Sequence, residues 1–142
     1  MNKIKVYTTR LYLAGPISSC STLDEANSFR EKAENLLALH DIGTINPLRG
    51  KIEDMKYSYR PAEIVQRDKM DIRRADGILV DMTEPDHPYI GTSMEIMYAH
   101  HLEKPVFVVT DWAKDHYWIQ YHATQIFESL EDAVEYIATY FF

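Results

Sequence analysis

The chain is poor in cysteine, in basic residues and in long apolar runs. Cys20 is the only cysteine among 142 residues, so no disulfide can form within the chain, and we expect a reducing compartment, the cytoplasm. A membrane-spanning helix needs about 18 consecutive apolar residues, and neither such a run nor the apolar segment of a secretory signal peptide occurs. The net charge of −7 argues against a nucleic-acid-binding surface, because such surfaces carry a basic stripe.

Common cofactor and metal motifs are also missing. No G-x-G-x-x-G follows the first predicted strand, where only Gly15-Pro16 occurs, and no G-x-x-x-x-G-K-[S/T] is present. These absences argue against a Rossmann dehydrogenase and against a P-loop enzyme. The adjacent residues His100 and His101 cannot share one face of a helix. We therefore predict neither a cofactor nor a bound metal.

Apolar runs of strand length alternate with stretches of helical periodicity. The predicted strands are 10–14, 42–45, 77–82 and 105–110, and the predicted helices are 23–40, 61–75, 92–102 and 129–140. We assign no element between Thr110 and Ser129. The strands are continuously apolar, as expected when helices cover both faces of a sheet. The sequence therefore predicts an α/β fold with a doubly wound parallel sheet, in three layers and one domain spanning 1–142.

Ligands of such sheets bind outside the carboxyl ends of the strands. The predicted loops at that edge are GPISS, NPLRGK, TEPDHPYIG and TDWAKDHYW. They contain most of the unusual residues of the chain, so we expect the functional site there.

Glu95 is a carboxylate within an apolar helical stretch. It lies three residues after Thr92, in the first turn of the predicted helix. The helix dipole and the free N–H groups of that turn favour an ionised carboxylate. Glu95 is thus a candidate catalytic group. The alternative is a capping box, Thr92-Ser93-Met94-Glu95, in which Glu95 bonds to the backbone.

Asp68 is a second carboxylate in an apolar setting. It is four residues from both Ile64 and Ile72, so it falls on the same helix face. A charge on a core-facing stripe is costly unless it is paired, hydrogen-bonded or at an opening. Asp68 is therefore a second catalytic candidate. The alternatives are a salt bridge to a nearby arginine, Arg67, Arg73 or Arg74, and a kink in the helix that lets Asp68 reach solvent.

Three segments together resemble the nucleoside 2-deoxyribosyltransferase family. They are LYLAGPIS, RDKMDIRRADGILVDM and GTSMEIMYAHHLEKPV, and the resemblance covers about Arg10 to Val109. It implies a flavodoxin-like fold and cleavage of the N-glycosidic bond of nucleosides or nucleotides. It also implies that Glu95 is the nucleophile, that Asp68, eight residues before Asp76, handles the proton, and that Tyr12 lies beside the nucleophile.

The two acids suit this chemistry. Breaking the C1′–N bond builds positive charge on the sugar and negative charge on the base. One carboxylate can trap the sugar as a glycosyl-enzyme while a second acid protonates the departing base, as in retaining glycosidases. The ligands implied are a nucleoside or nucleotide and a free nucleobase, with neither a nucleic acid nor a membrane as partner.

The chain departs from the family's pattern in the loops. Tyr89 stands six residues before Glu95, where nucleoside transferases often carry an aspartate and nucleoside monophosphate hydrolases a serine. The hydrolases also carry an arginine in the first loop, where this chain has Ser18. Because a phenol brings no charge to match a phosphate, we expect transfer between unphosphorylated deoxynucleosides. Hydrolysis of nucleoside 5′-monophosphates is the alternative.

The expected substrate-binding residues come from three loops. Asn46 and Arg49 are candidates for contact with the base, and the alternative for both is a turn with solvated charges. The full set is Gly15, Pro16, Ser18, Asn46, Arg49, Tyr89, Gly91 and Thr92.

Two further hypotheses concern the chain as a whole. A non-enzymatic ligand-binding module of the receiver type would need clustered acids after the first strand, and AGPISS has none.

The segment DWAKDHYWIQYHA is rich in aromatic residues, and in the family the corresponding region completes a neighbour's active site. The resemblance therefore implies a homo-oligomer.

Overall fold

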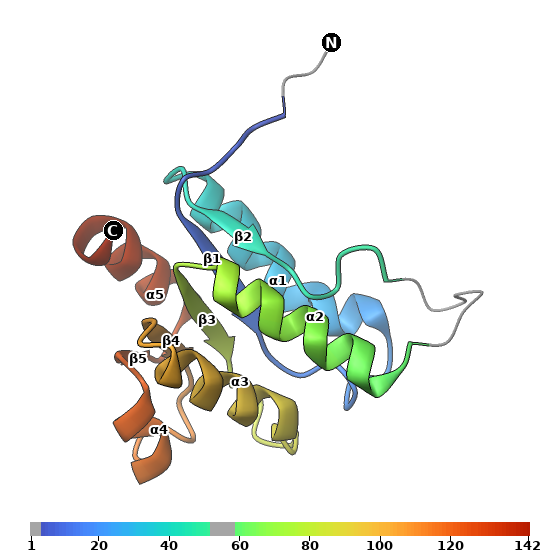
Figure 1. Cartoon of the computed structure of the whole chain (residues 1–142). Helices are drawn as coiled ribbons and strands as arrows, with labels where there is room; N and C mark the ends of the chain where they lie inside the picture. Colours follow the sequence, from blue (N-terminus) through green and yellow to red (C-terminus); the bar gives the residue numbers. More distant parts are fainter. Residues whose placement is uncertain (1–3, 52–58) are drawn as a thin grey trace.

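The computed structural model describes residues 4–51 and 59–142, and a single parallel sheet lies at its centre (Figure 1). The strands, in spatial order, are β2 (Gly43–Ile45), β1 (Arg10–Ala14), β3 (Gly77–Asp81), β4 (Val106–Val109) and β5 (Gln125–Phe127). All neighbouring strands pair in parallel. This order is that of flavodoxin, so the predicted doubly wound sheet is confirmed.

Helices cover both faces of this sheet. They are α1 (Leu23–Ala38), α2 (Pro61–Arg74), α3 (Ile90–His101), α4 (Tyr117–His122) and α5 (Leu130–Tyr136), with a π-helical turn η1 (Ile137–Phe141) at the end. The helices α1 and α5 pack on one face, and α2 and α3 on the other (Figure 1). The predicted three layers are therefore present. No helix in 4–51 or 59–142 is long and apolar enough to cross a membrane.

β1 illustrates why the strands are continuously apolar. Leu11 and Leu13 pack in the core formed with α1 and α5, whereas Tyr12 and Ala14 pack in the core formed with α2 and α3. All four side chains are at most 1% exposed. Both faces of the strand are thus buried, which removes the polar alternation seen in half-exposed strands.

The strand order places the switch point of the sheet between β1 and β3. From β1 the chain continues to β2 on one side, and from β2 it returns to β3 on the other side. The loops that follow β1 and β3 therefore diverge at the carboxyl edge, at the switch point where doubly wound sheets bind ligands. Tyr12 comes from β1, Asp68 from α2 and Glu95 from α3, so the three predicted catalytic residues lie on elements that border this point.

The start of α3 differs from the sequence prediction. The helix begins at Ile90, and its N-cap is Tyr89 in the left-handed conformation (φ 54°), without a side-chain cap. Glu95 consequently lies in the second turn, and the capping box proposed for it is wrong. Thr22 and Ser129, by contrast, cap α1 and α5 through their side chains.

Two elements lie in the segment to which the sequence pattern assigned none. The helix α4 has only six residues, too few for a clear apolar period. The strand β5 lies at the edge of the sheet, and its three residues are exposed or half-buried, so it lacks the apolar run of a central strand. The predicted helix 129–140 is divided between α5 and η1.

Candidate active site

Tyr12 and Glu95 form the centre of the site. The Tyr12 hydroxyl donates a hydrogen bond to Glu95 Oε2. Tyr12 is 1% exposed, and Glu95 is half-buried. Burial, followed by the negative charge of Glu95, raises the pKa of Tyr12 well above its usual value. Tyr12 therefore stays protonated and acts as a fixed donor to one oxygen of the carboxylate.

Burial also raises the pKa of Glu95, to about 7. The Tyr12 hydrogen bond opposes this rise, the neighbouring charge of Asp68 adds to it, and the positive charges of Arg30 and Lys51 oppose it. The sequence prediction that a helix start keeps Glu95 ionised is thus wrong, because the residue lies beyond the first turn. The pKa of Glu95 instead lies near neutral pH, where a catalytic carboxyl can be present in both its protonated and its ionised form.

Asp68 is half-buried on α2 and is not ion-paired within the described residues. Its Oδ1 is buried and has no hydrogen-bond partner among those residues. Burial raises the pKa of the Asp68 carboxyl, the charge of Lys51 opposes this rise, and that of Asp71 adds to it. A raised pKa and an unused oxygen are what a proton donor to a substrate requires.

The salt bridges proposed as one alternative for Asp68 do not form within the described residues. Arg67 donates to the carbonyl of Arg49 at 2.7 Å, and Arg73 donates to the Tyr98 hydroxyl at 2.7 Å. Arg74 lies 3.9 Å from Asp71. The arginines of α2 therefore have other partners.

Arg30 is a buried cation that the sequence reasoning missed. It is 1% exposed and donates to the carbonyls of Leu13 at 3.3 Å, Gly15 at 2.9 Å and Pro16 at 3.2 Å. Its charge lowers the pKa of Glu95, and its own pKa is lowered by burial. One signal was available, because Arg30 lies on the apolar stripe of its helix between Ala26 and Ala33.

Lys51 is a second cation that the sequence reasoning did not select. It is half-buried in the loop between β2 and α2, and burial lowers its pKa. Its charge lowers the pKa of both Asp68 and Glu95. The two acids are thus flanked by Arg30 on the side of α1 and by Lys51 on the side of the β2–α2 loop.

The loop after β1 approaches β3 closely. A Cβ on Gly15 would lie 3.0 Å from the Cβ of Asp81, so only glycine fits without a shift. The carbonyls of Gly15 and Pro16 accept from Arg30, while Ser18 is exposed. Of the predicted binding residues in this loop, Gly15 is buried, Pro16 is half-buried and Ser18 alone is exposed.

Asn46 and Arg49 are engaged within the fold. Asn46 Nδ2 donates to Asn27 Oδ1 at 2.8 Å and to Glu34 Oε1 at 2.7 Å. Arg49 forms a bidentate pair with the buried carboxylate of Asp71, at 2.6 and 2.8 Å. Both residues brace the loop against α1 and α2, which agrees better with a structural turn than with contact to a base.

The predicted binding residues around the start of α3 differ in exposure. Tyr89 is buried, and its hydroxyl donates to the carbonyl of Glu84 at 2.5 Å. Burial raises the pKa of Tyr89 above its usual value. Thr92 is buried, whereas Gly91 is exposed with open space around its Cα. The Tyr89 phenol is therefore occupied within its own loop.

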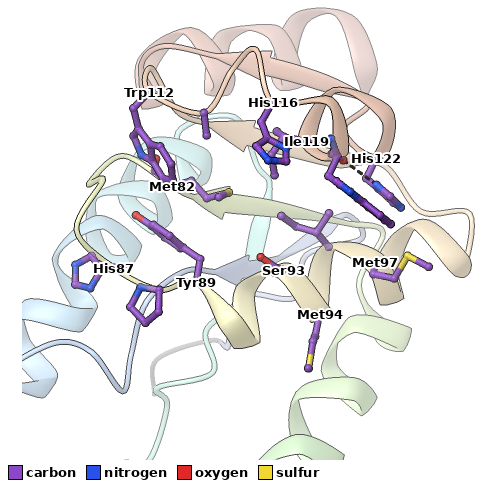
Figure 2. A pocket seen from close by; sticks show the side chains of 14 residues that line it. Met82, His87, Tyr89, Ser93, Met94, Met97, Trp112, His116, Ile119 and His122 are labelled. Carbon is purple, nitrogen blue, oxygen red and sulfur yellow. Dashed lines mark hydrogen bonds between the residues drawn. The ribbon is translucent and has the colours of Figure 1, made fainter.

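An apolar cavity of about 560 Å³ lies between the start of α3 and the segment from Trp112 to His122. Figure 2 shows Trp112, His116 and Ile119 facing Met82, Tyr89 and the start of α3. The α3 residues that line it are Ser93, Met94, Ile96 and Met97. The lining of this cavity does not include Tyr12, Asp68 or Glu95. The cavity and the cluster of titratable groups are therefore two different candidate sites.

Solved structures of similar fold include deoxyribosyltransferases. A 2-deoxyribosyltransferase from Bacillus psychrosaccharolyticus has a TM-score of 0.73 at 19% identity, covering 90% of this chain and 92% of that one. The enzyme from Leishmania mexicana has a TM-score of 0.72 at 18% identity, covering 94% and 99%. The CMP N-glycosidase of Clostridium botulinum has a TM-score of 0.58 at 15% identity, covering 93% and 100%.

The sequence itself carries the family assignment. No curated protein matches the chain. The model of one family, nucleoside 2-deoxyribosyltransferase, matches residues 11–133. This stretch contains the three segments that carried the resemblance and extends through α4 and β5. The chain therefore belongs to the nucleoside 2-deoxyribosyltransferase family.

Proposed function

We propose that this chain cleaves the N-glycosidic bond of 2′-deoxynucleosides and transfers the deoxyribosyl group to an acceptor base. The observation that carries the proposal is the position of Glu95, which accepts from the Tyr12 hydroxyl and lies close enough to Asp68 for their charges to interact. Two carboxyl groups with raised pKa values, one held by a phenol, form the pair that glycosyl transfer through a covalent intermediate requires.

In the first half-reaction Glu95 attacks the sugar. An electron pair of the ionised carboxylate forms a bond to C1′, the C1′–N bond breaks, and its electrons move to the base. Asp68 gives its proton to the base, which leaves as a neutral molecule. The reactive state therefore has Glu95 ionised and Asp68 protonated, so that the two acids hold one proton between them.

In the second half-reaction an acceptor base takes the place of the first. Its nitrogen attacks C1′, the bond from C1′ to Glu95 breaks, and the carboxylate is restored. Asp68 accepts the proton that the new base releases, by microscopic reversibility. Tyr12 donates to one Glu95 oxygen throughout, which leaves the other oxygen for the bond to carbon.

Arg30 and Lys51 favour the ionised form of Glu95. They thereby oppose the effect of burial, which favours the protonated form. A carboxylate that is partly dry and flanked by fixed charges needs little solvent rearrangement when it attacks. A base that covers Asp68 would favour the protonated form of this carboxyl, because further loss of water raises the pKa of an acid.

Hydrolysis of a nucleoside 5′-monophosphate is the second candidate, and the similar fold of a CMP N-glycosidase supports it. We favour the unphosphorylated substrate because the loops after β1 and β3, residues 15–22 and 82–89, contain neither lysine nor arginine. The N–H groups of Arg30 point to backbone carbonyls, and the Tyr89 hydroxyl has its own acceptor. A dianionic phosphate would find few partners there.

A product analysis separates the candidates. The protein is incubated with a panel of deoxynucleosides and their 5′-monophosphates, each with and without an acceptor base, and the products are separated by chromatography. We expect a new nucleoside only when the acceptor is present, and kcat/KM at least tenfold higher for the free nucleoside. Equal release of free sugar with and without acceptor, or a tenfold advantage for the monophosphate, would contradict the transferase proposal.

We also propose a homo-oligomer, in a reducing compartment such as the cytoplasm. An exposed apolar surface over α3 and α4 supports the oligomer, since patches of this kind mark interaction sites. Met94 is 68% exposed and Trp118 is 57% exposed. The surface comprises Ile90, Met94, Met97, Tyr117, Trp118 and Tyr121.

Light scattering after gel filtration tests the oligomer and should give a multiple of the chain mass of 16.6 kDa. The double variant Met97→Glu with Trp118→Glu should have the mass of the monomer. A monomeric unmodified protein would contradict this.

A further inference from the structure

Cys20, Glu25 and His87 come together at the carboxyl edge of the sheet from three separate segments. Cys20 lies in the loop after β1, Glu25 in the first turn of α1, and His87 in the loop between β3 and α3. One possible ligand atom of each lies within 4.8 Å of the other two. Figure 2 shows His87 at the rim of the apolar cavity, on the side of the pale blue N-terminal ribbon.

The donor set defines the class of ion. A thiolate, an imidazole and a carboxylate are ligands of Zn²⁺, whereas Mg²⁺ and Ca²⁺ prefer oxygen alone. With metal–ligand bonds of about 2.0–2.3 Å, ligand atoms in a tetrahedral site lie roughly 3.3–3.7 Å apart. The three ligand atoms lie within 4.8 Å of one another, so a tetrahedral site requires them to approach by up to about 1–1.5 Å. Rotations of the three side chains could supply this movement.

We propose that Cys20, Glu25 and His87 bind one Zn²⁺ ion, with a fourth position open to water. Each side chain has an atom that could bind the ion. The Cys20 thiol donates to the Pro16 carbonyl at 3.7 Å, and its sulfur can bind the ion once the thiol loses its proton. Glu25 Oε2 accepts from the Ser21 N–H at 2.9 Å, which leaves Oε1. The Ser19 hydroxyl lies 2.5 Å from His87 Nδ1, which leaves Nε2. Supporting bonds of this kind orient metal ligands in known sites.

The ion would fasten two loops that border the proposed active site. His87 and Ser19 are 68 residues apart in the chain, and the hydrogen bond between them links the two loops within the described residues. A bound ion would add a stronger link beside Gly15, whose backbone already approaches Asp81. The site goes beyond the proposed transfer reaction, because none of its three ligands takes part in that chemistry.

Metal binding is tested on tag-free protein, reduced with a phosphine and freed of metal with a chelator. Zn²⁺ is titrated in competition with a chromophoric chelator, and Co²⁺ is titrated while the absorption spectrum is recorded. We expect one Zn²⁺ per chain and a thiolate-to-cobalt charge-transfer band in the near ultraviolet. Cys20→Ser, Glu25→Gln and His87→Ala should each weaken Zn²⁺ binding at least tenfold, and Cys20→Ser should abolish the band.

Two control variants address other ligands. His100 and His122 lie close together, with their ring centroids 4.7 Å apart, and Glu31 is an exposed carboxylate further along α1. We expect His100→Ala and Glu31→Gln to bind Zn²⁺ as the unmodified protein does. Loss of binding in His100→Ala, unchanged binding in Cys20→Ser, or less than half an equivalent bound by the unmodified protein would overturn the proposal. The cobalt spectrum decides the matter even if one variant does not fold.

Discussion

The Tyr12 hydroxyl on β1 donates to the Glu95 carboxylate on α3, 83 residues later in the chain. The bond crosses from the sheet to a helix at the switch point of the topology, next to Asp68 of α2. It lowers the pKa of Glu95 against the stronger effect of burial. The proposed reaction depends on this balance, since Glu95 must be ionised to attack the sugar.

Tyr12→Phe should shift the acidic limb of the pH profile of kcat/KM to higher pH. Activity falls as Glu95 becomes protonated, with a pKa of about 7, and loss of the donor raises that pKa further. The measurement is kcat/KM for one deoxynucleoside across the neutral range. Tyr98→Phe is the matched control, because Tyr98 on α3 contacts Arg73 instead of an acid. A limb that stays in place or moves to lower pH would contradict the role of Tyr12.

Lys51→Met should also raise the pKa of Glu95, because the charge of Lys51 lowers it. The same change should raise the pKa of Asp68. Lys51→Arg keeps the charge and should leave the limb near its original pH, and Lys69→Met, on the exposed side of α2, should have no effect. If Lys51→Met and Lys51→Arg shift the profile equally, a structural role of Lys51 explains the result better than charge.

Asp68→Asn should slow natural substrates far more than activated ones. A purine leaves poorly without a proton, whereas an aglycone that is stable as an anion needs little help. General-acid catalysis typically contributes about 10²–10⁴ in rate. The comparison is kcat/KM of Asp68→Asn and of the unmodified protein on a purine deoxynucleoside and on a deoxyriboside with a nitrophenolate leaving group. Equal slowing of both substrates would exclude proton donation by Asp68.

Glu95→Gln should stabilise the fold at alkaline pH. The pKa of Glu95 is raised from 4.5 to about 7 in the folded state, so the folded state binds more protons, and stability falls as pH rises between these values. A shift of this size corresponds to at most about 3 kcal/mol. Urea unfolding at pH 8 should show Glu95→Gln as the more stable protein, with the difference vanishing near pH 4. Glu31→Gln should differ at neither pH.

The fold was accessible to sequence reasoning because its strands are buried on both faces. Leu11 and Leu13 on one side of β1, and Tyr12 and Ala14 on the other, give the apolar run that predicts a covered parallel strand. The family and its class of enzyme, predicted from three segments, are confirmed by the family match over 11–133, which also sets aside a non-enzymatic module.

Sequence reasoning predicted only part of the candidate site. Asp68 was found because its spacing puts a charge on an apolar stripe, yet the same reasoning overlooked Arg30 on its own stripe. The start of α3 was misplaced because Tyr89 adopts a left-handed conformation that its residue type does not favour. Arg49 contacts Asp71, and Cys20 lies close to His87. Both contacts join segments that are distant in the sequence, so no residue spacing predicts them.

The central claim is that Glu95 carries the deoxyribosyl group. The direct measurement is mass spectrometry of peptides from protein quenched in acid during turnover of a 2′-fluorinated deoxynucleoside, whose fluorine slows release of the sugar. We expect one peptide, the one containing Glu95, to gain the mass of the fluorinated sugar, and we expect no gain in Glu95→Ala, which should be inactive. An adduct on another residue, or turnover by Glu95→Ala within tenfold of the unmodified protein, would contradict the account.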